Sequence, residues 1–421
     1  MTTFDDAALA ALPQAPGFTE TLRTRAFQEF QALPMPSPET EEWRYTDLSG
    51  FDLDFVPHTP GHGGGTPEHR GALAATMLQH NSSVVMTTSG QDLESRGVIF
   101  CDLDVAAEKY ADLLEPHLHA LVPTGRTRFT ALHAAFRTGG TFLYVPADVA
   151  IEAPLQTLTY LDADGAAVFP HTVIVAERGA EVTFIDRFAS PDLDRALSDA
   201  VTEIVVGDGA HVRYVAIQEW GAGVTHLGVQ RATVGRDADF RSLSIGLGAS
   251  LSRAEVETVL AAPGGFSEML GIFFADGEQH FDHRSIQDHV APNCTSDLLY
   301  KGALRDASRA VYSGWVHVRP NAQKTGAMQT SRNIVLSEHA KADAIPNLEI
   351  EANDVRCGHA ASVGPVDEDA IFYLQSRGIP ADEAERLIVT GFFQEVLDRV
   401  TIEEVRRGGE LAIAEELERA S

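Results

Sequence analysis

Residues 333–378 read NIVLSEHAKADAIPNLEIEANDVRCGHAASVGPVDEDAIFYLQSRG, and they change from strand-like to helix-like sequence at one point. Within 348–355, the apolar residues are spaced like one face of a strand that ends in a small turn. After Pro365, three acidic residues stand before AIFYL, as in the first turn of a helix. The stretch therefore predicts the end of a β-rich domain and the start of a helical one.

A repeat precedes this boundary. From residue 140 onward, two alternating apolar runs are joined again and again by a turn of small or acidic residues. The turns begin at Gly179, Gly209, Asp237 and Gly264, so their spacings are 30, 28 and 27 residues. Regular spacing of this kind is typical of stacked coils, each of which buries its apolar face against its neighbours. The pattern favours a β-helix of parallel strands.

A β-sandwich is the alternative all-β fold. It would show turns every 8–12 residues and hairpin dipeptides such as Asn-Gly. Neither feature dominates here, so the β-helix is the better prediction, and the sandwich stays open on the pattern alone.

Three regions are expected: a mainly helical region at 1–138, a β-helix core at 139–365 and a helical region at 366–421. In the first region, apolar spacing predicts helices at 19–33, about 102–115 and about 127–137.

The helix expected after Pro380 carries an apolar stripe. Its residues Phe392, Phe393, Val396 and Leu397 admit two interpretations. They could dock the helix onto the end of the β-helix, which needs a cap against edge pairing. They could also bind a partner, and we take them as candidate partner-binding residues.

Charge and hydropathy exclude several classes of function. The net charge of the 421 residues is -29, whereas nucleic-acid binding needs clustered Lys and Arg, so no nucleic-acid partner is expected. No apolar run approaches the roughly 20 residues that cross a bilayer. Acidic residues stand at the N-terminus where a signal peptide would carry positive charge, so a cytoplasmic location is expected.

The spacing of the cysteines and the absence of glycine-rich nucleotide motifs exclude further classes of function. The three cysteines are widely separated and odd in number, which argues against a disulfide framework. There is no Cys-x-x-C pair for a zinc or ferredoxin-type site, and no G-x-x-x-x-G-K-[ST] loop for nucleotide phosphates. We therefore expect no intrinsic ATPase, and no enzyme activity.

Three groups of residues could nevertheless bind a metal. Residues 280–294 contain three histidines, two aspartates and Cys294, but His280 and His283 are three apart and would face opposite sides of a strand. A structural role is favoured for this block. His58, His62 and His69 lie in a loop rich in glycine and proline, which gives a metal site little support.

The third group is the pair Cys357 and His359. Their spacing places both side chains on one face of a strand, where both could approach one iron or sulfur. Two ligands are too few for a tetrahedral site, so a partner would have to complete it. The alternative is a small buried cysteine beside a hydrogen-bonded histidine.

Three motifs carry a resemblance to a known family. Residues 372–379 (FYLQSRGI), 41–48 (EEWRYTDL) and the block at 279–289 resemble segments of the SufB/SufD family of iron–sulfur cluster assembly proteins. The resemblance implies a right-handed parallel β-helix and a place in the Suf complex beside a separate ATPase subunit, SufC. It also implies that clusters are built at a SufB–SufD interface, from a cysteine of SufB and a histidine of SufD.

The resemblance is nearer to the SufD branch. His359 matches the SufD histidine, whereas residues 339–344 lack the essential SufB cysteine and Ala360 stands where SufB has glutamate. The branch implies a heterodimer with SufB, binding of SufC through the C-terminal helical region, and a homodimer as an option for the isolated chain. It also implies no tightly bound cofactor of this chain's own, and a transient iron–sulfur cluster at the SufB interface.

Two other functions compete with this hypothesis. One is a SufB-like scaffold that holds a cluster itself. The other is a carbohydrate-active β-helix enzyme, which would need paired carboxylates in a long cleft.

Overall fold

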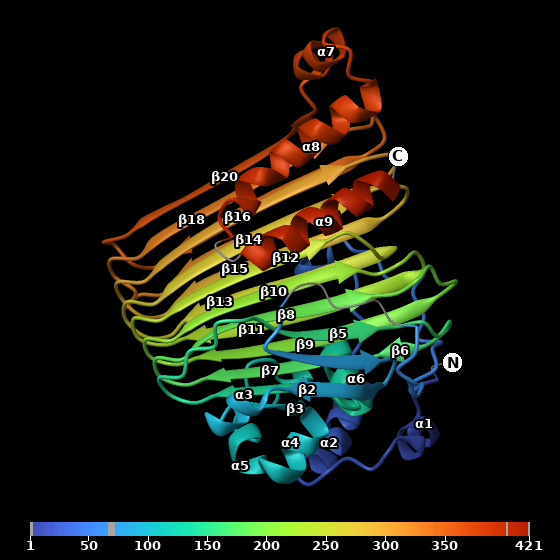
Figure 1. The fold of residues 1–421 in the computed structure, drawn as a ribbon, viewed down its shortest axis with the longest axis vertical. Helices are drawn as coiled ribbons and strands as arrows, with labels where there is room; N and C mark the ends of the chain where they lie inside the picture. The colour runs from blue at the N-terminus through green and yellow to red at the C-terminus, as the bar shows by residue number, and fades with distance from the viewer. Residues whose placement is uncertain (1–2, 66–71, 401–402, 420–421) are drawn as a thin grey trace.

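About eight coils of chain stack along one axis and form the centre of the molecule (Figure 1). The computed structural model describes residues 3–65, 72–400 and 403–419. Each coil contributes one strand to each of two sheets, and successive strands of a sheet run parallel. The β-helix predicted from the turn spacing is therefore confirmed, and the sandwich is excluded.

The two sheets lie on opposite sides of the coil axis. The first has the order β2-β1-β5-β8-β10-β12-β14-β16-β18-β20, and the second has β19-β17-β15-β13-β11-β9-β7-β4-β3 with β6 beside β9. The strands of the first sheet are β1 Ala75–His80, β2 Ser83–Ser89, β5 Leu155–Tyr160, β8 Glu181–Ala189, β10 His211–Glu219, β12 Asp239–Gly246, β14 Phe266–Ala275, β16 Thr295–Leu304, β18 Gly326–Val335 and β20 Arg356–Pro365. Those of the second are β3 Ile99–Asp102, β4 Thr141–Val145, β6 Ala167–Val168, β7 His171–Ala176, β9 Ala196–Val206, β11 Val224–Val234, β13 Leu251–Leu260, β15 His280–His289, β17 Arg309–Val318 and β19 Lys341–Ile350.

The predicted turns form one column along the β-helix. All four take a left-handed backbone conformation, with φ of 67° at Gly179, 66° at Gly209, 53° at Asp237 and 81° at Gly264. Glycine and, less readily, aspartate tolerate this conformation because it brings a side chain close to the following carbonyl group. The repeat is thus set by the residues that can turn the chain.

Hydrogen bonds link these turns from coil to coil. The backbone N–H of each turn residue donates to a carbonyl oxygen in the corresponding turn of the next coil. The bonds are Asp148 to Arg178 (2.9 Å), Gly179 to Asp208 (2.9 Å), Gly209 to Arg236 (2.7 Å), Asp237 to Pro263 (3.1 Å), Gly264 to Pro292 (3.4 Å), Asn293 to Gln323 (2.9 Å) and Lys324 to Asp354 (2.5 Å). The strand ladders therefore continue through the turns, and successive coils are held in one register.

The N-terminal region is less purely helical than expected. Its helices are α1 Asp6–Ala11, α2 Thr19–Ala32, η1 Glu41–Trp43, α3 Gln91–Ser95, α4 Leu103–Lys109, α5 Ala111–Leu114, η2 Thr124–Arg126 and α6 Arg128–Phe136. The helix predicted at 102–115 is broken at Tyr110, and that at 127–137 is confirmed. The prediction of a mainly helical region is wrong for residues 75–102, which include strands: β1 pairs with β5, and β3 pairs with β4. The N-terminal region therefore also contributes the first strands of both sheets.

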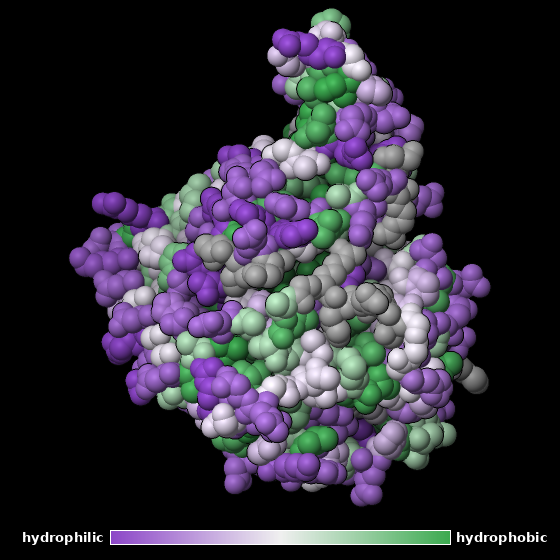
Figure 2. All heavy atoms as spheres, in the orientation of Figure 1, coloured by the Kyte–Doolittle hydropathy of each residue, from purple (hydrophilic) through white to green (hydrophobic). Residues whose placement is uncertain are grey.

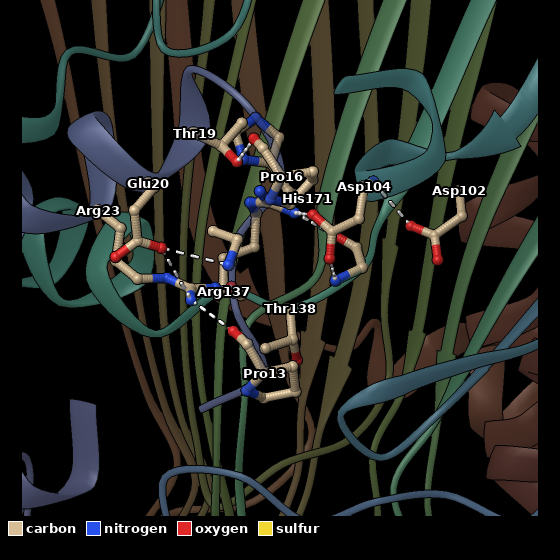
Figure 3. Close-up of polar contacts among 12 residues, drawn as sticks. Pro13, Pro16, Thr19, Glu20, Arg23, Asp102, Asp104, Arg137, Thr138 and His171 are labelled. Carbon is tan, nitrogen blue, oxygen red and sulfur yellow. Dashed lines mark hydrogen bonds and ion pairs between the residues drawn. The ribbon is translucent and has the colours of Figure 1, made fainter. Parts of the chain in front are cut away.

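Helices of this region cover the outer face of the second sheet over its first coils. Phe27, Phe136 and their neighbours pack against Leu197 and Leu227 of β9 and β11. A polar joint lies beside this apolar contact, where the Arg137 guanidinium donates to Asp104 Oδ1 at 2.9 Å (Figure 3). The packing fastens these helices to the β-helix, and the ion pair joins α4 to the end of α6.

The C-terminal region follows the last strand. It comprises α7 Glu368–Ser376, α8 Ala381–Leu397 and α9 Glu403–Arg419. Asp367 caps α7 by accepting from the N–H groups of Asp369 and Ala370, as the acidic start in the sequence predicts. No helix within the described parts of the chain is both long and apolar enough to cross a membrane.

Helices α8 and α9 lie across the side of the β-helix and not on its end (Figure 1). They pack on the outer face of the first sheet, against residues of β8 to β16 that include Val215, Leu243 and Phe274. A Cβ at Gly409 would come within 2.9 Å of Ile245 Cδ1, so glycine here permits close contact. The prediction that this region docks onto the end of the β-helix is therefore wrong. An apolar stripe indicates that one face of a helix is buried, but it does not indicate which surface buries that face.

Gly209→Ala tests the turn column. We expect it to lower the free energy of unfolding by about 1 kcal/mol, since alanine is strained at φ 66°. Gly50→Ala is the control, because Gly50 has an ordinary φ and open space around its Cβ position. Denaturant midpoints measure the effect, and equal stability of the two variants would show that the turn does not require glycine.

Candidate functional site

The β-helix ends in an uncovered coil. Strand β19 and strand β20 are the last strands of the second and first sheets, and their residues are half-buried or exposed along their whole length. Among the described residues, no strand pairs with their outer edges. At the other end, the terminal strands β2 and β3 run antiparallel to their neighbours, whereas β19 and β20 continue the parallel coils. The last coil therefore offers open backbone groups to another chain.

Cys357 and His359 lie on this last coil. They stand in register with Ala327 and Gln329 of β18, two buried residues of the inner face. Both side chains are therefore on the inner face of β20, the shared face that their spacing predicts. Cys357 packs half-buried beside Ala327, and burial raises the pKa of its thiol above the usual value. His359 is exposed at the open end.

A polar layer lies directly beneath the last coil. Gln329, Ser331 and Asn333 occupy successive inner positions of β18 and are all buried. Gln329 Nε2 and Oε1, Ser331 Oγ and Asn333 Oδ1 have no hydrogen-bond partner within the described structure. Buried polar groups without partners cost about 1–3 kcal/mol each, so this layer favours water, an ion or a partner's polar groups at the open end.

The block at 280–294 does not form a metal site. On β15, His280 and Asp282 face outward, where the Thr46 hydroxyl donates to Asp282 Oδ2 at 2.6 Å and lies 3.4 Å from His280 Nε2. His283 and His289 face inward and are six residues apart, or about 20 Å along the strand. These side chains anchor an outer segment and fill the interior, which is the structural role favoured from the sequence.

Cys294 and the other histidines add no ligands to that block. The Cys294 thiol is buried and donates to the Ala262 carbonyl oxygen at 3.3 Å. The N–H groups of His62 and Gly63 donate to His80 Nδ1, so the loop packs by its backbone. His69 lies outside the described residues.

The EEWRYTDL segment is held by Trp43 and not by Tyr45. Trp43 is buried, and the Arg253 guanidinium lies 4.0 Å from its ring centroid. Arg253 also pairs with Asp282 of β15. Tyr45, however, is 42% exposed, so its ring does not anchor the segment.

The predicted partner-binding residues lie mostly inside the molecule. Phe393 and Val396 are fully buried and Leu397 is 2% exposed, all against the first sheet. Phe392 is half-buried, and Lys301 Nζ lies 4.4 Å from its ring centroid. Phe393, Val396 and Leu397 therefore dock α8 onto its own β-helix, and of the four candidate residues only Phe392 is left partly accessible.

A cleft of about 690 Å³ lies over the outer face of the second sheet, between the 40–43 segment, α6 and strands β11 to β17. Three of its carboxylates are held by arginines. The pairs are Arg126 with Glu255, Arg231 with Glu257 at 2.6 Å, and Arg319 with Asp288 at 3.0 Å. Asp199 also lines the cleft, and burial raises the pKa of its carboxyl group well above the usual value.

The sequence matches two family domains that together span both sheets. Residues 72–157 match the SufBD protein N-terminal region, and residues 159–392 match the SufBD core domain of SUF system FeS cluster assembly. The core match covers more than half of the chain.

This chain belongs to the SufBD family.

Relatives agree along nearly the whole length. The SufBD chain is 32% identical to the iron–sulfur cluster assembly protein SufD of Bacillus subtilis, over 94% of this chain and 93% of that protein. It is 31% identical to a SufBD family protein of Staphylococcus aureus and 29% identical to one of Staphylococcus saprophyticus, in each case over 92% of this chain and 86% of the relative. The family assignment from the three motifs is confirmed, and with it a role in iron–sulfur cluster assembly.

One cluster in this SufBD chain was not predicted from the sequence. His119, His133 and His171 meet beneath the N-terminal helices, with Glu203 behind them. Burial is the main cause that lowers the pKa of His119 to about 3 and the pKa values of His133 and His171 well below the usual value. The four residues come from separate segments with no shared spacing, so no local motif could have revealed them.

Phe393→Ala tests the docking of α8. We expect removal of this fully buried ring to cost about 3–5 kcal/mol, and hence to speed hydrogen exchange across α8 and α9. Phe372→Ala is the matched control, because Phe372 of α7 is 70% exposed. Unchanged exchange in Phe393→Ala would show that α8 is held by other contacts.

The rate of alkylation tests the environment of Cys357. Its raised pKa leaves little reactive thiolate near pH 8, so the rate should be below that of a free cysteine peptide and should rise about tenfold per pH unit. Cys294 should react later than Cys357 because its side chain is buried. Cys101 should also react later, because the pKa of its thiol is raised to about 12. Peptide mapping by mass spectrometry gives the order, and labelling of Cys294 before Cys357 would contradict the inward packing described above.

Proposed function

We propose that this chain is the SufD-type, non-catalytic subunit of a Suf complex and that its last coil pairs with SufB. The observation that carries the proposal is the uncovered end of the β-helix. Every earlier coil is covered by a following coil, whereas β19 and β20 leave open edges and a polar inner layer. Open edges of this kind bind a second chain by adding strands.

The inner face of the last coil supports a role near the cluster. His359 is exposed there and Cys357 lies two residues before it on the same face. An imidazole and a thiolate suit iron, but a tetrahedral iron or cluster needs ligands beyond these two. We infer that SufB supplies them, including the cysteine that residues 339–344 lack. The iron–sulfur cluster is then a cargo of the interface, held briefly.

The projecting end of the C-terminal region supports binding of the SufC ATPase. Figure 2 shows apolar atoms on the surface of α7 and the adjacent end of α8, where Phe372 is 70% exposed and Leu387 is 44% exposed. Helix α7 extends beyond the body of the β-helix (Figure 1). Because α8 packs on β14 and β16 and pairs with β18 through Glu395 and Arg332, movement of SufC on ATP binding would be passed through these strands to the SufB interface.

Co-elution with SufB and SufC tests the assembly, and the Ser362→Lys variant tests the surface. Ser362 is exposed on β20, and a lysine there places a charge on the open edge. We expect the wild-type chain to co-elute with both partners and Ser362→Lys to lose SufB. Ser95→Lys is the control, since Ser95 is exposed in α3 at the other end of the molecule. Equal binding of SufB by all three chains would reject the last coil as the interface.

The same complex tests His359. We expect His359→Ala to leave the complex intact and to reduce cluster formation, whereas His339→Ala, in the exposed turn before β19, should not. Undiminished cluster formation by His359→Ala would remove this residue from the site. A stable brown protein formed by the isolated chain, and lost on Cys357→Ala, would instead favour the SufB-like scaffold.

A further inference from the structure

Three histidines converge in the interior, far from the last coil. His119 lies in the turn after α5, His133 on α6 and His171 on β7, and one ring nitrogen from each lies within 4.8 Å of the other two. The side chains are enclosed between the N-terminal helices and the outer face of the second sheet, with exposures of 7%, 0% and 1%. Figure 3 shows His171 beside the polar joint of Arg137 and Asp104.

Each histidine already uses one ring nitrogen on an oxygen acceptor. His119 Nδ1 lies 3.2 Å from the Val122 carbonyl oxygen, His133 Nδ1 lies 2.7 Å from that of Asp199, and His171 Nε2 lies 3.1 Å from Glu203 Oε2. A carbonyl or carboxylate oxygen only accepts, so these three nitrogens carry the hydrogens. A neutral imidazole has a single N–H, which leaves lone pairs on the remaining nitrogens.

The three remaining nitrogens point at one another. His133 Nε2 and His171 Nδ1 are 3.1 Å apart, and His119 Nε2 is buried with no hydrogen-bond partner in the described structure. Lone pairs repel at this distance unless a cation or an additional proton lies between them. The pattern of donors therefore leaves a place for positive charge where the three lone pairs meet.

Glu203 is built to support such a site. Its carboxylate accepts from the backbone N–H groups of His119 at 2.6 Å, Leu121 at 2.7 Å and Val122 at 2.9 Å. These bonds hold Glu203 in place while it orients the His171 ring. A carboxylate that fixes a metal-binding histidine through its second nitrogen is a common arrangement in metalloproteins.

We propose that His119, His133 and His171 bind one divalent first-row transition-metal ion, of which Zn²⁺ is the representative, with Glu203 as the positioning residue. Neutral imidazoles suit Zn²⁺, Fe²⁺, Cu²⁺ and Ni²⁺. In a tetrahedral zinc site the ligand nitrogens lie about 3.3 Å apart, close to the 3.1 Å between His133 and His171. A small inward shift of the His119 ring would bring its Nε2 into place as the third ligand nitrogen.

The metal would link the N-terminal region to the first coils. Two ligands come from the segment before the β-helix and one from β7, while Glu203 belongs to β9. The ion would therefore stabilise the start of the β-helix. It would be separate from the iron–sulfur cluster proposed at the opposite end of the molecule. The site does not depend on the proposed pairing with SufB.

The test uses the full chain, depleted of metal by a chelator and shown by circular dichroism to stay folded. We expect one equivalent of Zn²⁺ to bind and to raise the melting temperature, and Co²⁺ in its place to give visible d–d bands. His119→Gln and His133→Gln should weaken binding at least tenfold, and Glu203→Gln by about 10–100-fold. His117→Gln is the matched control, since His117 lies two residues from His119 and outside the cluster.

Two results would overturn the proposal. One is a folded wild-type chain that binds none of Zn²⁺, Co²⁺, Fe²⁺ or Ni²⁺ in stoichiometric amount. The other is binding that persists in both His119→Gln and His133→Gln. If these variants do not fold, X-ray absorption on the wild-type Zn²⁺ form decides, because histidine scattering supports the site and sulfur scattering rejects it.

Discussion

The stacking of one coil on the next is the constraint from which the rest of this structure follows. Strand ladders alone would hold the two sheets, but the turns also bond to one another from Asp148 to Lys324. Each turn must therefore take the same left-handed conformation at the same place in its coil. This common conformation fixes the register of the strands, and the register decides which side chains point inward.

The coils leave two outer faces and two ends to be covered. N-terminal helices cover the second sheet and C-terminal helices cover the first. Antiparallel strands β2 and β3 end the sheets at the first end, while β19 and β20 leave a parallel coil uncovered at the last end. Cys357 and His359 lie on that open coil above buried groups that lack hydrogen-bond partners. The proposed pairing with SufB is thus assigned to the end of the β-helix that is left uncovered.

The helix starts and the shared face of Cys357 and His359 could be predicted because each depends on residues a few positions apart, and the repeat could be predicted because its turns recur every 27–30 residues. Contacts between distant segments could not be predicted in this way. The stripe of α8 shows that Phe393 is buried, yet only the tertiary structure shows that the side of the β-helix, and not its end or a partner, buries it. Tyr45 resembles Trp43 in the sequence but remains exposed.

The histidine cluster shows the same limit more strongly. His119, His133, His171 and Glu203 have no common motif, and they meet only because helices of the N-terminal region pack on the second sheet. The reverse case is the block at 280–294, which has many ligand types close together in the sequence. The extended strand separates them, since alternate residues face opposite sides and each residue adds about 3.3 Å.

The open last coil also has a consequence for how the cell must produce this protein. Unpaired backbone N–H and C=O groups at the edge of a sheet can pair with any extended polypeptide, including other copies of the same chain. Surplus molecules would therefore tend to self-associate or precipitate. Synthesis of this protein and of whatever occupies this edge should then be matched in amount and in time.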